Sequence, residues 1–126
     1  MKYLLDSDVI IEVLRENIKV AAKLKELYLK GNILMFSPVT KAEIYYGIRK
    51  GEENKTANLF AQLECILIDA KIGEKAGIYL KSYRKSHGVQ LSDALIAASS
   101  FCAKACLITF NEKHYPMKEI TLYSLS

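Results

Sequence analysis

The chain has 126 residues, of which 51% are hydrophobic and 25% charged, and its formal net charge is +4 at pH 7. These proportions exclude a disordered chain, and the mild positive charge permits a polyanionic partner without requiring one. We expect a single domain over residues 1–126, large enough to bury roughly two thirds of its unfolded surface. No apolar stretch approaches the ~20 residues that cross a bilayer and no signal-peptide core follows Lys2, so we expect a cytoplasmic protein without a membrane partner.

Short apolar runs alternate with helical patterns along the chain. Residues 1–5 lack a helical period and are predicted to form a strand that is buried on both faces. Further short strands are predicted at 33–36, 65–68, 106–109 and 120–123. Helical spacing predicts helices over 9–15, 18–30, 38–50, 52–64, 70–86 and 94–103. This alternation predicts an α/β fold in which helices cover both faces of a mostly parallel sheet of four to five strands.

Capping residues mark several of these helix boundaries. Asn17, Ser37 and Asp69 stand where side chains accept hydrogen bonds from the first turn of a helix. Gly51 and Gly88 stand where helices are expected to end.

The three cysteines, in a chain without an export signal, predict free thiols in a reducing compartment. Cys102 and Cys106 are four residues apart and would share a face if one helix carried both. No second Cys or His pair accompanies them, so we expect small buried side chains and not a zinc site.

Acidic residues follow or adjoin the predicted strand ends. Asp6-Ser7-Asp8 comes directly after the first strand, and Asn111 follows the fourth. Glu43 lies two helical turns beyond the second strand, and Asp93 begins the most apolar helix, which leads into the fourth strand. Because parallel strands end at the same edge of a sheet, we expect Asp6, Glu43 and Asp93 to meet in one cleft there.

Each of these residues also has a local explanation. Ser7 or Asp8 can cap the following helix, Thr40 with Glu43 matches a capping box, and Asp93 suits the positive end of a helix dipole. These roles do not explain three carboxylates in one cleft, where like charges raise at least one pKa unless a cation neutralises them. Hard oxygen ligands favour Mg²⁺ or Mn²⁺, and such an ion is equipped to hydrolyse phosphate esters.

Four segments together resemble, in the same order, the motifs of PIN-domain ribonucleases, and most closely those of VapC-type toxins. They are Tyr3-Leu4-Leu5-Asp6-Ser7-Asp8-Val9, Ser37-x-x-Thr40-x-x-Glu43-x-x-x-Gly47, Leu91-Ser92-Asp93-Ala94-Leu95-Ile96-Ala97 and Leu107-Ile108-Thr109-Phe110-Asn111-x-x-His114-Tyr115. The resemblance covers almost the whole chain. It implies a three-layer α/β/α fold, RNA cleavage that depends on Mg²⁺ or Mn²⁺, a cognate antitoxin that plugs the cleft, and a homodimer.

The resemblance also assigns roles to single residues. Asp6, Glu43 and Asp93 match the family's acidic residues and would hold the metal ion, with Glu43 as ligand or as the base that orients water. Many relatives place an aspartate at Asn111 or His114, and neither is acidic here, so Asn111 would be a neutral member of the catalytic set. Candidate RNA contacts, each of which is alternatively an ordinary solvated side chain, are Ser7, Lys41, Arg49, Lys50 and Lys55, followed by Arg84 and Lys85.

Three other functions fit parts of the sequence. Asp6-Ser7-Asp8 after a strand also resembles haloacid-dehalogenase phosphatases, which need a later acidic pair that this chain lacks. A receiver-like signalling module would use Asp69 as its phosphoacceptor, although Asp69 is more simply a helix cap. A catalytically weak or inactive PIN-type RNA-binding module is the third alternative, because neither Asn111 nor His114 in the fourth motif is acidic.

Overall fold

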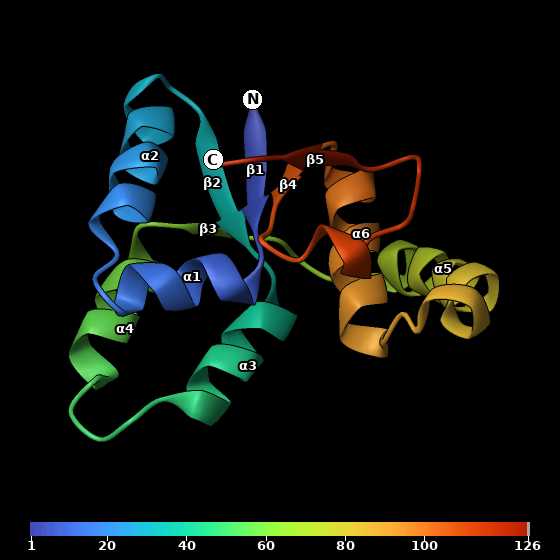
Figure 1. The fold of residues 1–126 in the computed structure, drawn as a ribbon, viewed down its shortest axis with the longest axis horizontal. Coiled ribbons are helices and arrows are strands. Elements are labelled where there is room, and N and C mark those ends of the chain that lie inside the picture. Colours follow the sequence, from blue (N-terminus) through green and yellow to red (C-terminus); the bar gives the residue numbers. More distant parts are fainter. Residues whose placement is uncertain (126) are drawn as a thin grey trace.

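In a computed structural model of the protein, which describes residues 1–125, five parallel strands form one sheet in the order β3-β2-β1-β4-β5. The strands are β1 (Lys2–Leu5), β2 (Ile33–Phe36), β3 (Glu64–Cys65), β4 (Cys106–Ile108) and β5 (Thr121–Tyr123). The first strand of the chain is therefore the central one (Figure 1). The predicted parallel sheet is confirmed.

Helices lie on both sides of this sheet (Figure 1). They are α1 (Ser7–Leu14), α2 (Ile18–Leu29), α3 (Pro38–Gly47), α4 (Glu53–Ala61), α5 (Ala70–His87) and α6 (Leu91–Ala103), with a 3₁₀ turn η1 (Glu112–His114) before β5. None of the helices within residues 1–125 is long and apolar enough to cross a membrane.

Alternating side chains of the strands divide the apolar interior into two cores. Leu4 and Leu107 pack with α5 and α6 on one face, whereas Leu5 and Ile108 pack with α1 and α2 on the other. All four are at most 1% exposed, as expected for central strands of a covered parallel sheet. The three-layer α/β/α arrangement predicted from the sequence is confirmed.

Predicted caps account for several helix boundaries. Asn17 accepts from the Val20 amide at 3.3 Å, Ser37 accepts from Val39 at 3.1 Å, and Asp69 accepts from Ile72 at 3.0 Å. The helix α5 ends at Gly88, whose φ of 66° is the left-handed conformation that glycine adopts without strain.

Four predicted helix boundaries are wrong by a few residues. The helix α4 ends at Ala61 and not at residue 64, because the strand β3 already begins at Glu64. The helix α1 begins at Ser7 and not at residue 9, because the Asp6 carboxylate accepts from the Ser7 amide at 2.8 Å and caps it. The helix α3 stops at Gly47 instead of residue 50, since glycine is a poor helix former and Ile48 is already extended. The helix α6 begins at Leu91, capped by Gln90.

The predicted strand over residues 65–68 is also wrong in its extent. The strand β3 has only Glu64 and Cys65, both exposed at the sheet edge, and pairs with β2. Ile66 still donates its amide to the Phe36 carbonyl at 2.8 Å, but its side chain is 5% exposed and belongs to the core beside α5. The chain therefore leaves the sheet sooner than its apolar run suggests.

The cysteines are free within the described chain. Cys102 lies in α6 and Cys106 in β4, because Lys104 turns the backbone between them with a φ of 56°. They share no helix face, which removes the geometry on which a zinc site would depend.

Candidate active site

A cleft of about 260 Å³ opens where the central strands end and α1 and α6 begin. All the predicted catalytic side chains line it, and so does Ser7: its walls include Asp6, Ser7, Asp8, Glu43, Asp93 and Asn111. We call this hollow the acid cleft. The convergence expected from the strand ends is thus present in the structure.

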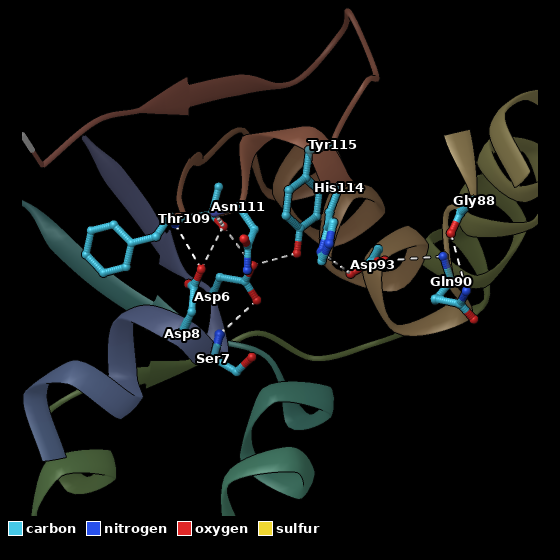
Figure 2. A network of polar contacts seen from close by, with 11 residues as sticks. Asp6, Ser7, Asp8, Gly88, Gln90, Asp93, Thr109, Asn111, His114 and Tyr115 are labelled. Atoms are coloured by element: carbon cyan, nitrogen blue, oxygen red, sulfur yellow. Dashed lines mark hydrogen bonds and ion pairs between the residues drawn. The ribbon is translucent and has the colours of Figure 1, made fainter. Parts of the chain in front are cut away.

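Asp6 is the most firmly held carboxylate of the acid cleft. It is 6% exposed, and its Oδ1 accepts from the Ser7 amide at 2.8 Å. Its Oδ2 accepts from the Thr109 hydroxyl at 2.9 Å and from the Tyr115 hydroxyl at 2.7 Å (Figure 2). Because each carboxylate oxygen has two lone pairs, these three donors leave one lone pair, on Oδ1.

Asp8 joins the start of α1 to the turn after β4. Its Oδ2 accepts from the Phe110 amide at 2.9 Å, while its Oδ1 is buried and has no hydrogen-bond partner among residues 1–125. Burial raises the pKa of the Asp8 carboxyl, and the neighbouring Asp6 carboxylate raises it further. The cap of α1 is Asp6, so the local explanation of Asp8 as a helix cap is wrong.

Glu43 reaches the acid cleft from α3. Burial raises the pKa of its carboxyl, and the carboxylates of Asp6 and Asp93 raise it further, whereas a hydrogen bond with the Ser7 side chain lowers it. The capping box of Thr40 with Glu43 is absent. It would require Thr40 to be the N-cap of α3, whereas the N-cap is Ser37, three residues earlier. Glu43 therefore has no local helix-capping role, and its electrostatic neighbours are the other two predicted acids.

Asp93 has a structural role as well as a place in the acid cleft. Its Oδ2 accepts from the Gln90 amide at 3.2 Å and completes the capping box of α6. Its Oδ1 lies 3.8 Å from Nδ1 of His114, which extends from η1 toward it (Figure 2). The hydrogen bond from the Gln90 amide agrees with the local explanation of Asp93 as an acid that stabilises the start of α6.

Asn111 lies on the rim of the acid cleft, in the turn after β4. Its side chain is exposed, and its backbone amide donates to Oγ1 of Thr109 at 3.0 Å. Thr109 therefore connects Asn111 to Asp6, since the same hydroxyl donates to Asp6 Oδ2. The fourth carboxylate lining the cleft comes from Asp8 on α1 and not from this turn.

The predicted basic residues lie outside the acid cleft. Lys41 projects its ammonium group over three rings, at 5.5–5.9 Å from the centroids of Phe36, Tyr45 and Phe60. Lys55 donates to the Leu14 carbonyl at 2.7 Å, and Lys50 is exposed between α3 and α4. Within residues 1–125 the cleft walls include no lysine or arginine. Contact of these residues with RNA stays a prediction.

Sequence reasoning gave no role to Thr109 or Tyr115 and treated Asp8 mainly as a possible helix cap. Thr109 and Tyr115 stand in the fourth motif, on either side of Asn111, and both are at most 5% exposed. A buried tyrosine hydroxyl needs a hydrogen-bond partner, and this requirement was the only indication that Tyr115 contacts a polar residue. Its partner is 109 residues away along the chain and is not encoded in any local spacing.

The donor atoms of the acid cleft suit a hard divalent cation. Its carboxylates supply oxygen ligands, and the buried, unpartnered Oδ1 of Asp8 adds an unsatisfied acceptor nearby. In the described part of the chain, however, no three His, Cys, Asp or Glu side chains stand close enough to enclose an ion. Binding would therefore draw the carboxylates together or use bridging water, which Mg²⁺ commonly retains.

Comparisons with known proteins agree with the fold and identify the family. Residues 3–120 match the model of the PIN domain. The chain is 34% identical over 117 residues to ribonuclease VapC10 of Mycobacterium tuberculosis, covering 92% of this chain and 87% of that protein. It is 30% identical over 115 residues to ribonuclease VapC19 of the same species, covering 90% and 92%.

A solved structure extends the likeness to three dimensions. The crystal structure of VapBC2 from Rickettsia felis, bound to a DNA fragment from their promoter, contains a chain that superposes with a TM-score of 0.83. The two chains are 25% identical, and the match covers 98% of each. Since the family match includes every strand that carries the acid cleft, the chain belongs to the PIN domain family and, within it, to the VapC-type ribonucleases.

Proposed function

We propose that this protein is an endoribonuclease that depends on Mg²⁺ or Mn²⁺ and is the toxin of a toxin–antitoxin pair. The observation that carries the proposal is the acid cleft, in which Asp6, Glu43 and Asp93 line a single hollow at the carboxyl end of the sheet. The ribonuclease names of VapC10 and VapC19 support RNA as the substrate. The similar chains in VapBC2 and in a toxin–antitoxin complex from Klebsiella pneumoniae support a cognate antitoxin as partner, and a homodimer is proposed from the family resemblance.

Asp6, Asp93 and Glu43 would hold the metal ion. When bound, the ion supplies a water of lowered pKa and positive charge beside the scissile phosphate. Asp6 presents one open lone pair from an immobilised carboxylate, which fixes where its oxygen stands. Glu43 and Asp93 approach from α3 and α6, so three separate parts of the chain would hold the ion.

Glu43 is suited to accept the proton of the attacking water. In the metal-free protein, burial and the Asp6 and Asp93 carboxylates raise the pKa of its carboxyl, and a hydrogen bond with Ser7 orients it. Glu43 would serve either as a ligand of the ion or as the base that orients the attacking water. Asn111 adds an amide at the rim that contacts the phosphate without repelling it. The water oxygen bonds to phosphorus as its proton is lost to the base. The bond from phosphorus to the 3′ oxygen breaks and that oxygen takes up a proton from solvent, which leaves 3′-hydroxyl and 5′-phosphate ends.

The alternatives receive less support. Asp69, the phosphoacceptor of a receiver module, is exposed and caps α5 by accepting from Ile72 at 3.0 Å. A haloacid-dehalogenase phosphatase needs an acidic pair after a later strand, and the residues after β4 that line the cleft, Asn111 and His114, are not acidic. The inactive RNA-binding module differs from the enzyme only in catalysis, so a cleavage assay separates these two.

The test is cleavage of a labelled RNA by purified protein in Mn²⁺, in Mg²⁺ and in chelator. We expect cleavage with either metal and none in chelator, and Asp6→Asn should lower the rate by at least ~100-fold, the usual loss when preorganised charge is removed. Asp69→Asn is the matched control, because it neutralises an exposed carboxylate outside the acid cleft. Cleavage that persists in chelator would refute the metal mechanism.

A further inference from the structure

A second hollow adjoins the acid cleft, between α1 and the segment that joins α3 to α4. It has a volume of about 240 Å³, and Glu43 lines both hollows. Arg15, at the end of α1, faces it from one side, and Arg49, just beyond α3, faces it from the other. The helices α1 and α3 are in contact, as Figure 1 shows, and Arg49 lies in the connection between α3 and α4. We call this hollow the arginine pocket.

The arginine pocket brings two guanidinium groups to one hollow. The sequence has three arginines, and two of them, Arg15 and Arg49, line this one hollow. Both are exposed, and among residues 1–125 neither guanidinium forms an ion pair with a carboxylate. A planar guanidinium is well matched to phosphate because it can donate two parallel hydrogen bonds.

The acidic residues of the pocket are already engaged elsewhere. Oε1 of Glu52 accepts from the Arg49 backbone amide at 2.8 Å, and Oε2 lies 3.7 Å from the Lys55 ammonium. Glu43 interacts with Ser7 and with the carboxylates of the acid cleft. The two guanidinium groups are therefore available to an anion from outside the chain.

We propose that the arginine pocket binds a phosphate of the RNA backbone next to the one held in the acid cleft. This inference rests on the proposed ribonuclease function and adds a subsite to it. The acid cleft itself has carboxylates and no lysine or arginine among its described wall residues, so without a metal ion it repels RNA. An RNA strand that runs along α1 past Glu43 passes from the repelling cleft into the pocket, where Arg15 and Arg49 attract it.

The apolar floor of the pocket strengthens this attraction. Ile11, Leu14 and Ile48 line it and are only partly exposed, so they lower the local dielectric around a bound phosphate. The continuity with the acid cleft favours the substrate over an acidic segment of a protein partner. Such a partner is nevertheless one of the outcomes that the test resolves.

The test is the salt dependence of RNA binding, measured by fluorescence anisotropy of a labelled single-stranded RNA in chelator. For single-stranded RNA, each neutralised phosphate contributes about 0.7 to the slope of log affinity against log salt concentration. The double variant Arg15→Gln/Arg49→Gln should therefore lose about 0.7 in slope. If the variant and the wild type bind RNA equally at 1 M salt, this loss of slope corresponds to roughly eightfold weaker binding of the variant at 50 mM salt.

Two further variants control for charge and for folding. Lys71→Gln/Lys81→Gln removes two charges from exposed positions on α5 and should leave the slope unchanged. Arg15→Lys/Arg49→Lys keeps the charge and should restore most of the slope. Thermal melting should show all variants folded, since the substituted side chains are exposed.

An unchanged slope in the arginine double variant, with normal cleavage by the wild type, would overturn the subsite and leave the ribonuclease proposal intact. Weaker binding of a co-expressed antitoxin together with an unchanged RNA slope would overturn it in favour of an acidic protein partner. Wild type that neither binds nor cleaves RNA would overturn both the subsite and the proposed function.

Discussion

Replacing Tyr115 with phenylalanine would remove one hydroxyl from the support of Asp6 and leave the buried ring in place. Tyr115 is 3% exposed, and its hydroxyl donates to Asp6 Oδ2 at 2.7 Å. Burial and the Asp6 carboxylate raise the pKa of this hydroxyl far above its usual range, so it remains a donor at every accessible pH. The substitution therefore tests one hydrogen bond.

The expected loss follows from the charge of the acceptor. A hydrogen bond to a charged group contributes about 1.5–3 kcal/mol, and Thr109 still donates to the same oxygen in the variant. We therefore expect the lower figure, about 1.5 kcal/mol of unfolding free energy, which corresponds to a melting temperature lower by roughly 5 °C. Asp6 would also be less firmly oriented, and Mn²⁺ should bind about tenfold more weakly.

Denaturant unfolding of metal-free protein and calorimetric titration with Mn²⁺ measure these two effects. Tyr79→Phe is the control, because Tyr79 is 2% exposed but lies in α5 and packs in the core away from the acid cleft. It should bind Mn²⁺ like the wild type. If Tyr115→Phe unfolds and binds Mn²⁺ within error of the wild type, the hydroxyl does not support Asp6.

Three further predictions concern the acid cleft and its partner. The pKa of Glu43 is raised in the folded, metal-free protein, so folding stabilises its neutral carboxyl. This contribution to the free energy of unfolding is complete below the unfolded pKa of about 4.3 and is lost as pH rises through the pKa of the folded protein. Glu43→Gln should therefore melt above the wild type in chelator at pH 7 and lose that advantage near pH 4; equal melting at both pH values would contradict the raised pKa. Asn111→Asp should tighten Mn²⁺ binding roughly fivefold, or about 1 kcal/mol at a dielectric near 80, whereas equal calorimetric affinities would mean that Asn111 only shapes the turn. A small protein encoded next to this chain should co-purify with it and abolish cleavage, and the lack of such a neighbour together with harmless expression would argue against a toxin.

Features that depend on local chemistry could be predicted from the sequence. The apolar run before Asp6 indicated a central strand, and Asn17, Ser37 and Asp69 indicated helix starts that the structure confirms. The convergence of Asp6, Glu43 and Asp93 followed from one topological rule, that parallel strands end at the same edge. These inferences needed no knowledge of side-chain contacts.

Features that depend on distant contacts could not be predicted. The carboxylate of Asp6 is held by Thr109 and Tyr115, more than 100 residues away, and no spacing in the sequence joins them. The position of the Lys41 ammonium group over three aromatic rings depends on how α3 packs, and its contact with RNA stays a prediction. Arg15 was overlooked because only the packing of α1 against α3 brings it near Arg49.

The most direct test of the central claim is sequencing of RNA ends in cells after brief expression of the chain. We predict new 5′-phosphate ends at defined sites for the wild type and for Asp69→Asn, and none above background for Asp6→Asn. The comparison isolates one carboxylate of the acid cleft, since both variants remove a single negative charge that caps a helix. The same new ends in cells that express Asp6→Asn would show that the cleavage does not come from this site.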